Sequence, residues 1–570
     1  MSTLSKRWIV ATPAPSDILE SYPNMGPILA QVLYNRGFTD AVSAEHFIDA
    51  KSDLGDPYQM LGINQAVHRV KLAIKRREPI VVYGDFDADG VTSTTLLMQT
   101  LTALGAVVKP YIPHRVDEGY GLNSEALLRL AREGVKLVIT VDCGIRSVDE
   151  VEDGKAAGLD LIVTDHHTIG PEIPKALAVI NPKQANCKYP EDMLAGVGVA
   201  FRLADGLIRA VKADRKEVKL ELEDLLDLVA IGTVADLAPM NRTENRALVR
   251  RGLEVINRAN RPGVRALLEV AGVKPGMVNA MNIGFALGPR INAAGRLESA
   301  MIAYHLLSAQ DYSTALRLAE QLQGLNVKRQ DLTREAQDEV RTWVEAQSGD
   351  APLIFASGEF LPGIVGLVAG RLTEEFSRPT VIMERGETES RASCRSIPQF
   401  DITHALDQCA DLLVRHGGHA QAAGFTVLNE NIPALKAKLM KLAEDTLSGR
   451  DLRPMLEIDV EIHPKQLTEW LVHDLTRLEP TGYHSSAPVF MTSNLKVLES
   501  RTVGKEGHHL KLKLARPGQP PLDAIGFNLG HWIDEMPERI DVAYQLEMNE
   551  WNGNRTLQLN MQDIRPAGST

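Results

Sequence analysis

Three aspartates at alternate positions directly follow an apolar segment that ends at Tyr83. Asp85, Asp87 and Asp89 stand in the sequence Tyr-Gly-Asp-Phe-Asp-Ala-Asp-Gly. Carboxylates this close repel one another unless a cation neutralises them, and hard oxygen ligands favour Mg²⁺ or Mn²⁺. A calcium-binding EF-hand loop is excluded, because its twelfth position, counted from Asp85, must be a glutamate and is Leu96 here. An aspartate-rich turn without a metal is the alternative.

Three further acid or histidine motifs end apolar runs. Asp142 ends one run, the triplet Asp165-His166-His167 ends a second, and Asp236 ends a third that has helical character. A lone aspartate at such a place is more often a helix cap than a ligand. Adjacent histidines point more strongly to a metal, since neutral imidazole binds transition-metal ions. At the end of a helix, the negative charge of Asp236 opposes the macrodipole and needs a compensating cation.

The elements around these residues predict a doubly wound α/β domain. From about residue 75, short β-rich runs alternate with helical stretches, which is typical of a parallel sheet covered by helices. Ligands of such sheets bind at the carboxyl ends of the strands, so we expect the motifs to meet there. The expected strands are 80–83, 107–112, 137–141 and 161–164, and the expected helices are 92–104, 123–132, 147–157 and 222–234.

The rest of the chain predicts three further parts. Residues 242–345 are mostly helical by pattern and end in a long helix, expected over 325–342. A second α/β unit follows, with strands at 353–356 and 380–383, a helix at 364–376 and a glycine cluster at 417–424. From about residue 455, short alternating strands with polar turns predict a small β-barrel.

Composition excludes several classes of protein. With 570 residues, 44% hydrophobic and 24% charged, the chain is globular and long enough for several domains. Its four cysteines form no CxxC pair, which favours a reducing compartment, and we expect a cytoplasmic protein without a membrane span. The net charge of −12 is unusual for a nucleic-acid binder. However, residues 242–265 hold seven arginines and two acids, which predicts either a basic surface or a solvated helix face.

Taken together, these motifs resemble the DHH phosphoesterase superfamily in order and spacing, and Asp165-His166-His167 matches its name motif. Residues 288–296, Gly-Pro-Arg-Ile-Asn-Ala-Ala-Gly-Arg, continue the resemblance. Residues 417–424, Gly-Gly-His-Ala-Gln-Ala-Ala-Gly, are similar to the glycine-rich signature of the DHH-associated domain. The match covers about residues 75–450, and with the terminal barrel the layout resembles the RecJ family of bacterial exonucleases.

The resemblance implies a site for two Mn²⁺ or Mg²⁺ ions, with Asp142 bridging them. Asp85 would take a supporting or general-base role, and His167 would lie behind the ligands or face the phosphate. If His166 is a ligand, activity should rise with pH as this histidine loses its proton. The implied metal ligands are Asp87, Asp89, Asp142, His166 and Asp236. The implied substrate-binding residues are Arg115, Arg290, Ser393, Arg395, Gly417, Gly418 and His419.

Glycines let backbone N–H groups approach a phosphate, and arginine supplies planar donors. For Gly417 and Gly418 a helix C-cap is the alternative. Three places depart from the family pattern: Phe360-Leu361 before Pro362-Gly363, Cys394 after Ser393, and the turn at 482–486 where the barrel begins.

The implied function is 5′-to-3′ degradation of single-stranded DNA in recombination and repair, by two-metal phosphodiester hydrolysis. The implied partners are single-stranded DNA, a single-strand-binding protein and a helicase. A shorter phosphodiesterase acting on nanoRNA or cyclic dinucleotides and an inactive replication scaffold are the rival hypotheses.

Trp551, Lys505, Lys511 and Lys513 are expected to bind the strand on the barrel. The expected parts are an N-terminal helical segment (1–74), a DHH catalytic domain (75–240), a helical connector (241–345), a DHH-associated domain (346–450) and an oligonucleotide-binding (OB) barrel (455–567).

Overall fold

The computed structural model describes residues 5–22, 24–50, 54–115, 117–119, 121–215, 217–346, 351–504, 507–551 and 554–569. The chain forms two compact units. One unit is built from residues 53–452, and the other combines residues 1–52 with residues 453–570. Among the described helices, none has the length and apolar character that crossing a bilayer requires.

A five-stranded parallel sheet is the centre of the first α/β domain, which spans residues 63–235. All five residues of β4 are buried, as expected for a strand covered on both faces. The strand order is β3-β2-β4-β5-β6. The chain passes from β2 to the edge strand β3, then crosses back to β4 on the other side of β2, and continues from β4 to the opposite edge. The strands are β2 Pro79–Tyr83, β3 Val107–Tyr111, β4 Leu137–Val141, β5 Asp160–Thr164 and β6 Ala178–Ile180.

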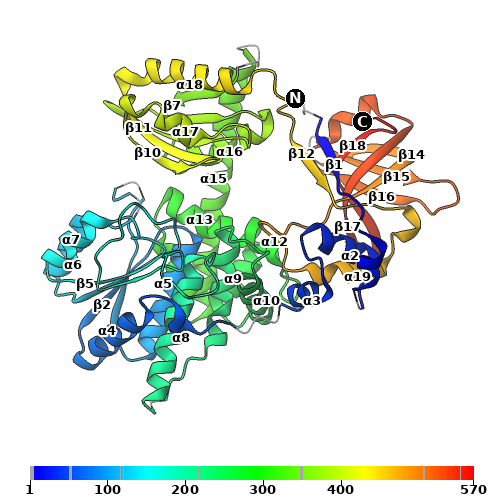
Figure 1. The fold of residues 1–570 in the computed structure, drawn as a ribbon. Coiled ribbons are helices and arrows are strands. Elements are labelled where there is room, and N and C mark those ends of the chain that lie inside the picture. Colours follow the sequence, from blue (N-terminus) through cyan, green and yellow to red (C-terminus); the bar gives the residue numbers. More distant parts are fainter. Residues whose placement is uncertain are drawn as a thin grey trace. The chain divides into compact units, whose positions relative to one another are not determined.

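Helices cover both faces of this sheet, which confirms the predicted doubly wound fold (Figure 1). The side chains of Ile80 and Val82 face the larger core with α4, α5 and α8. Those of Val81 and Tyr83 face a smaller core with α6 and α7. The helices are α4 Ile63–Arg76, α5 Ala88–Ala103, α6 Ser124–Arg132, α7 Val148–Ala156 and α8 Gly196–Ala213.

A helical layer follows and ends in a long helix. The helix expected over 222–234 is divided into a 3₁₀ turn, η2 Leu222–Leu225, and α9 Leu226–Ala235. The long helix α15, Tyr312–Ala346, packs its first half on other helices of this layer and its second half on the second α/β domain (Figure 1). Between α9 and α15 the chain forms α10 Thr243–Arg258, α11 Pro262–Val270, α12 Ala280–Asn282, the π-helix η3 Ile283–Leu287, α13 Gly288–Leu297 and α14 Met301–Ser308.

The arginine-rich run at 242–265 contributes to the packing of this layer. Arg246 is completely buried. Arg242 donates to Glu191 over 2.9 Å, and Arg261 donates to Asp227 over 2.6 Å. These three arginines therefore hold helices and loops together, whereas Arg258 and Arg265 of the same run are exposed, as expected for a solvated face.

The second α/β domain has a mixed sheet in the order β10-β11-β9-β8-β7. One face packs on α17 and α18, and α16 covers part of the other face. Its elements are β7 Ile354–Gly358, α16 Val365–Phe376, β8 Thr380–Glu384, β9 Glu389–Arg395, α17 Ile402–Asp407, β10 Leu413–His419, β11 Ala422–Leu428 and α18 Ile432–Leu447.

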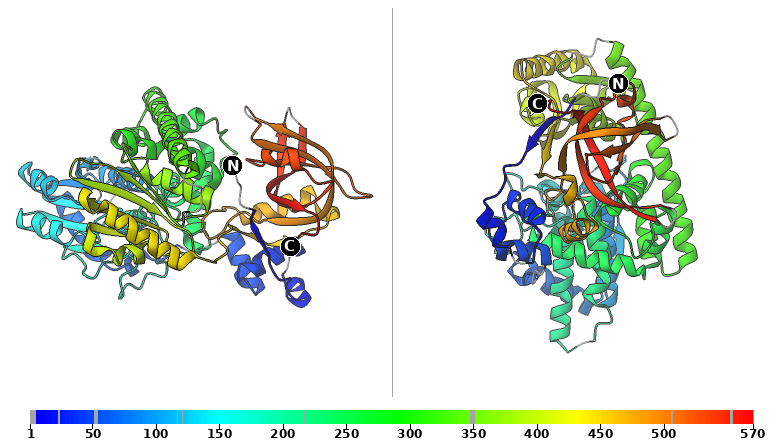
Figure 2. Two further views of the ribbon diagram at one scale, coloured as in Figure 1. Left: turned by 90° about the horizontal axis from the view of Figure 1, so that it is seen from above. Right: turned by 90° about the vertical axis from the view of Figure 1, so that its right-hand side faces the viewer.

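The other unit is a closed β-barrel joined by N-terminal helices. Strand β14 pairs with both β15 and β17, which closes the ring β14-β15-β16-β18-β17, drawn from orange to red in Figure 2. Residues of α2 and α3 share the barrel's core, and β1 pairs with β12. The elements are β1 Arg7–Val10, α1 Ser16–Glu20, α2 Pro27–Asn35, α3 Ala41–Asp49, β12 Met455–Ile458, α19 Glu469–Leu475, β14 Phe490–Val503, β15 His509–Ala515, β16 Leu522–Gly526, β17 Arg539–Trp551 and β18 Asn554–Pro566.

The turn at 482–486, which departs from the family pattern, stabilises this unit. Gly482 and Ser485 exchange backbone hydrogen bonds, and Arg36 at the end of α2 donates to the Ser485 hydroxyl over 3.3 Å. The turn therefore anchors an N-terminal helix. Of the residues expected to bind a strand on the barrel, Lys505 and the side chain of Trp551 lie outside the described part.

Candidate metal centre

The predicted motifs meet where the winding of the first sheet reverses. Asp85, Asp87 and Asp89 follow β2, and Asp142 follows β4, the neighbouring strand. Asp165 and the two histidines follow β5, which lies on the other side of β4. A reversal of this kind opens a crevice at the carboxyl ends of the strands.

The turn between β2 and α5 holds Asp87 and Asp89 by different anchors. Asp87 caps α5 and accepts from the N–H groups of Asp89 at 2.9 Å and Gly90 at 3.0 Å. The two oxygens of Asp89 accept from Gly196 N at 2.6 Å and Val197 N at 2.8 Å, the first N–H groups of α8. A helix N-terminus stabilises negative charge, so α8 holds the Asp89 carboxylate in place.

Asp142 occupies the centre of the cluster in a strained backbone conformation. Its φ is +61°, in the left-handed region that a residue with a side chain rarely adopts. The side chain is buried, and a Cβ atom on Gly196 would stand only 2.7 Å from the Asp142 Cβ. Strain of this kind persists only where the surroundings impose it, as at functional sites.

His166 lies among the carboxylates with an unpaired nitrogen. Its Nε2 is 3.1 Å from Asp142 Oδ1, 3.7 Å from Asp236 Oδ2 and 3.8 Å from Asp89 Oδ2. Asp236 caps the end of α9, as the sequence predicts for an acid after an apolar helix. Lys183 donates to the His166 carbonyl oxygen, and its charge offsets part of the rise in the pKa of Asp236.

Asp165 organises the histidine pair, although the sequence analysis assigned it no role. Its Oδ1 accepts from His166 N at 2.7 Å and His167 N at 3.0 Å, and it lies 2.8 Å from His167 Nδ1. Its Oδ2 accepts from Ile145 N at 2.9 Å. These contacts fix both the loop and the ring of His167, which is half-buried. Carboxylate–histidine pairs of this kind orient ligands in metal sites.

The donor set fits metal ions. Three overlapping groups have ligand atoms within 4.8 Å of one another. Asp142 Oδ1, His166 Nε2 and Asp85 Oδ1 are buried without a hydrogen-bond partner among the described residues. Buried polar atoms are normally paired, so these atoms fit the ligands of a cation. The groups are Asp85–Asp87–Asp142, Asp89–His166–Asp236 and Asp142–His166–His167, which include every predicted ligand and also Asp85 and His167.

Burial and mutual repulsion shift the ionisation of this cluster. Burial, followed by neighbouring carboxylates, raises the pKa of Asp142 and Asp236 well above the usual range and that of Asp89 to about 7. The pKa of Asp85 rises for the same reasons. Burial lowers the pKa of His166 to about 3. A bound cation would reverse the carboxylate shifts, because it favours the ionised ligands.

Several arginines extend the candidate site from the cluster of aspartates and histidines to the second α/β domain. Arg115 lies 4.6 Å above the Phe86 ring, and its charge offsets part of the rise in the pKa of Asp85 that burial and Asp87 cause. Arg296, which the sequence analysis did not single out, donates to Gly363 O over 3.0 Å. Burial, with the charges of Arg115, Arg329 and Arg395, lowers the pKa of Arg296 to about 10. Such a concentration of cations suits an anionic substrate.

Arg290 has protein partners of its own. Its Nη1 donates to Ala286 O over 2.7 Å, and its Nε donates to Gln323 Oε1 over 2.7 Å. These contacts brace α13 against the turn before it and against α15. Arg290 therefore has a structural role, and its predicted contact with substrate stays a prediction.

The predicted residues of the second α/β domain share one patch of its sheet. Ser393 and Arg395 lie on β9, and Gly417, Gly418 and His419 lie on β10, so the helix C-cap alternative is wrong. At Gly418, where φ is +149°, a Cβ atom would stand 2.4 Å from a backbone oxygen. In register across the sheet, Ser393 pairs with Gly424 and Gly424 with Gly417, while Arg395 pairs with Ala422 and Ala422 with His419.

Two nearby residues that depart from the family pattern, Phe360 and Cys394, pack in the cores of the second α/β domain. Phe360 is buried in the core under α16, and Leu361 beside it is exposed. Cys394 is completely buried on the opposite side of β9 from Ser393 and Arg395. The cysteine therefore leaves the predicted phosphate-binding face unchanged.

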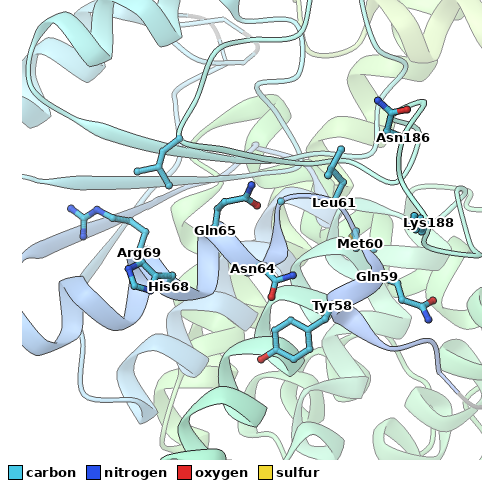
Figure 3. Close-up of a pocket in the computed structure, with 12 residues that line it drawn as sticks. Tyr58, Gln59, Met60, Leu61, Asn64, Gln65, His68, Arg69, Asn186 and Lys188 are labelled. Carbon is cyan, nitrogen blue, oxygen red and sulfur yellow. The ribbon is translucent and has the colours of Figure 1, made fainter.

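A cavity of about 870 Å³ lies elsewhere on the first α/β domain, around the start of α4 (Figure 3). Asn64, Gln65 and His68 of α4 line it, together with Leu61 and Lys188. None of the residues predicted for the site lines this cavity. The candidate centre for chemistry therefore remains the group of aspartates and histidines described above, called the acid–histidine cluster from here on. Its members are Asp85, Asp87, Asp89, Asp142, His166, His167 and Asp236.

Three family models match the chain, and each covers one of its parts. The N-terminal domain of the DHH family matches residues 79–233. The DHHA1 domain matches residues 351–445, and the RecJ OB domain matches residues 458–563. The predicted second domain and barrel thus correspond to known domain families.

Relatives with known names match almost the whole chain. It is 38% identical to the single-stranded-DNA-specific exonuclease RecJ of Bacillus subtilis, over 98% of this chain and 70% of that protein. It is 35% identical to the RecJ of Dickeya dadantii, over 95% of this chain and 97% of that protein. The solved structure of Thermus thermophilus RecJ with Mn²⁺ is 30% identical, with a TM-score of 0.85 over 100% of this chain and 81% of that one.

Proposed function

The chain belongs to the RecJ family of single-stranded-DNA-specific exonucleases, and we propose that it hydrolyses single-stranded DNA at the acid–histidine cluster with two divalent metal ions. The observation that carries this proposal is the set of unpaired buried atoms, Asp85 Oδ1, Asp142 Oδ1 and His166 Nε2, at the carboxyl ends of β2, β4 and β5. Mn²⁺ and Mg²⁺ are the proposed ions, since the Thermus relative was crystallised with each of them.

Metal binding is the proposed task of Asp87, Asp89, Asp142, His166 and Asp236. Asp142 and His166 each belong to two of the three candidate groups, and of these two side chains only the Asp142 carboxylate has two oxygens with which it would bind both ions. When bound, two such ions supply an activated water and stabilise charge on the attacking and leaving oxygens of an in-line displacement. His166 offers a neutral nitrogen, because burial lowers its pKa to about 3.

Proton transfer and phosphate binding fall to the remaining residues of the cluster. Asp85 can keep a proton, since burial and Asp87 raise the pKa of its carboxyl, which suits a general acid or base. Burial lowers the pKa of His167, but the hydrogen bond and charge of Asp165, together with the charges of Asp89 and Asp87, outweigh burial and raise this pKa above its ordinary value. A protonated His167 is a suitable partner for a phosphate oxygen.

The strand would be held by its phosphates. Arg115 lies beside the cluster. Arg395 of the second α/β domain donates to Ser393 Oγ over 3.2 Å, and it is near enough to Arg296 for its charge to lower the pKa of Arg296, as the charge of Arg115 also does. Degradation from 5′ to 3′ is the direction that the family resemblance implies. The barrel matches the RecJ OB domain and would add affinity for the strand, since OB domains stack bases above a basic groove. A single-strand-binding protein and a helicase as partners, and a cytoplasmic location, stay predictions.

The rival hypotheses receive less support. A shorter phosphodiesterase for nanoRNA or cyclic dinucleotides would not need residues 458–563, which match the RecJ OB domain. An inactive scaffold would not need the complete donor set with its unpaired buried atoms.

The test is hydrolysis of a labelled single strand and of the same sequence as a blunt duplex, each with Mn²⁺ and with EDTA. We expect rapid, Mn²⁺-dependent cleavage of the single strand and slow cleavage of the duplex. Equal rates on both substrates would contradict the proposed strand choice. Activity in EDTA would contradict the metal mechanism.

A further inference from the structure

Phe285 carries an unusually exposed aromatic ring. Its exposed fraction is 82%, and no other large apolar side chain of the described residues is as exposed. Leu237, at 63%, and Met281, at 54%, are also exposed. Apolar side chains gathered on a surface normally mark a place where something binds.

These residues belong to elements at the metal centre. Leu237 directly follows Asp236, a proposed ligand at the end of α9. The π-helix that holds Phe285 packs on the last turn of α9, because a Cβ atom on its Gly284 would stand 3.9 Å from Val234 Cγ1, and one on the following Gly288 would stand 3.2 Å from the Ala235 Cβ. Phe285 therefore lies on the rim of the proposed active site, on the side of Asp236.

The turn that presents Phe285 is fixed in place. Arg290 donates to Ala286 O, the carbonyl next to Phe285, over 2.7 Å. The following helix α13 rests on the metal-binding turn, since Asn292 accepts from Ala88 N at 2.7 Å. π-helical turns occur frequently at functional sites, and this one directs an apolar ring to solvent from a braced scaffold.

We infer that Phe285 is a stacking platform for one unpaired base of the DNA strand that enters the catalytic centre, with Leu237 and Met281 flanking that base. This inference rests on the proposed function. An unpaired base offers an apolar π-face, and its stacking on an aromatic ring does not depend on sequence. In a duplex the same face is covered by neighbouring base pairs, so the platform would also favour single strands. Phe285 would act on binding, because the metal ligands and not this ring contact the reacting phosphate.

The expected size of the effect follows from stacking energies in single-strand binding. Loss of the ring should raise KM for single strands roughly 5- to 150-fold, the range of one base stacked on an aromatic residue, and leave kcat nearly unchanged. Phe285→Trp should retain a low KM. Phe285→Leu, which keeps apolar character without a π-face, should resemble Phe285→Ala. Leu128→Ala on α6 is the control, since Leu128 is 41% exposed but faces the other side of the sheet.

The decisive test couples the residue to a base. KM is measured on the full-length protein with Mn²⁺ for single strands that each carry one abasic nucleotide at a different position. For the wild type, one position should raise KM in the stated range, and Phe285→Ala should be insensitive to the abasic nucleotide at that position. A Phe285→Ala protein with normal KM, or with the same abasic sensitivity as wild type, would overturn the inference. Failure of the wild type to cleave any single strand would instead contradict the proposed function.

Discussion

Asp165 shows how a residue outside the ligand set can determine the geometry of the site. Its carboxylate holds the backbone of His166 and the ring of His167, and it also accepts from Ile145 N. An asparagine would keep the shape but lose the charge that orients the ring. We therefore expect Asp165→Asn to reduce kcat/KM about 10- to 100-fold, as is usual for partners of metal ligands. Glu152→Gln, at an exposed carboxylate on α7, is the control, and equal activity of the two variants would contradict this role.

The raised pKa values of the carboxylates predict how stability depends on pH and metal. Burial raises the pKa of Asp89 to about 7, so its neutral form is favoured in the metal-free fold. The resulting stability is complete below the unfolded pKa of about 3.9 and is lost as pH rises through the folded pKa. Asp142 and Asp236 shift in the same direction. We expect the metal-free Tm to fall between about pH 4 and 7, and Mn²⁺ to raise Tm more at pH 8 than at pH 5.5.

Thermal unfolding in EDTA and in Mn²⁺ measures both effects. Asp142→Asn should raise the metal-free Tm at pH 8 and abolish most of the Mn²⁺ shift. An Mn²⁺ shift of equal size at both pH values would contradict the ionisation scheme. Burial lowers the pKa of His166 to about 3. The sequence-based expectation that activity rises as His166 loses its proton stays a prediction, and we expect the carboxylates to contribute to any rise above about pH 5.

At the residue scale, sequence predicts side chains that end apolar runs. The acids after β2, β4 and α9 were identifiable because a charge after a buried segment needs compensation. Asp165 has the same kind of position, but its role depends on N–H groups from another loop. Arg296 is polar in an ordinary helical pattern, and its hydrogen bond to Gly363 O reaches the second α/β domain. Such contacts between distant segments leave no local signal.

The N-terminus of α8 is the element that brings two motifs together. Gly196 donates to Asp89, and its missing side chain leaves space for Asp142. In Gly196→Ala the new Cβ would stand 2.7 Å from the Asp142 Cβ, so one of the two must move. A displacement of about 1 Å near reacting groups costs about 10²-fold in rate. We therefore expect a loss of this size in kcat and weaker Mn²⁺ binding by titration calorimetry.

Gly198→Ala is the matched control for this prediction. It lies two residues later in α8, and its Cβ would stand 3.2 Å from the Leu194 Cβ, away from the metal ligands. It should retain activity, with a stability change of at most about 1 kcal/mol. Comparable activity losses in both variants would show that the effect comes from helix packing and not from Asp142.

The expected strands and helices of both α/β domains were largely confirmed because their apolar runs are short and regular. The differences occur where tertiary contacts decide. The run at 222–234 divides into a 3₁₀ turn and α9, and Gly417 and Gly418 lie in a strand beside β11 and not at a helix end. The π-helix that carries Phe285 has no sequence signal that distinguishes it from an α-helix.

At the scale of the whole molecule, the two ends of the chain form one unit. Residues 1–52 share a core with the barrel, where Leu29 and Leu33 of α2 are completely buried. No local pattern predicts this, because the contacting segments are separated by the entire catalytic unit. A truncation after residue 450 would leave α2 without its partner, so both ends must be removed together.

A chain of residues 54–452 should therefore keep the chemistry and lose affinity. We expect it to cleave very short oligonucleotides at saturation with nearly normal kcat. We also expect weaker binding to long single strands and a flatter dependence of log Kd on log salt, because phosphate contacts of the barrel are lost. Fluorescence anisotropy at several salt concentrations measures both. If the folded fragment binds long strands with unchanged affinity and salt slope, the barrel does not bind nucleic acid.

The most direct test of the metal centre is the turnover of a labelled single strand by Asp142→Ala in saturating Mn²⁺, with strand affinity measured in parallel. Asp142 is buried at the centre of the cluster and belongs to two candidate metal groups. Its loss should reduce kcat by more than the roughly 100-fold that marks indirect effects on a metal site, while Kd for the strand stays nearly unchanged. Turnover close to that of the wild type would contradict the assignment of the acid–histidine cluster as the catalytic centre.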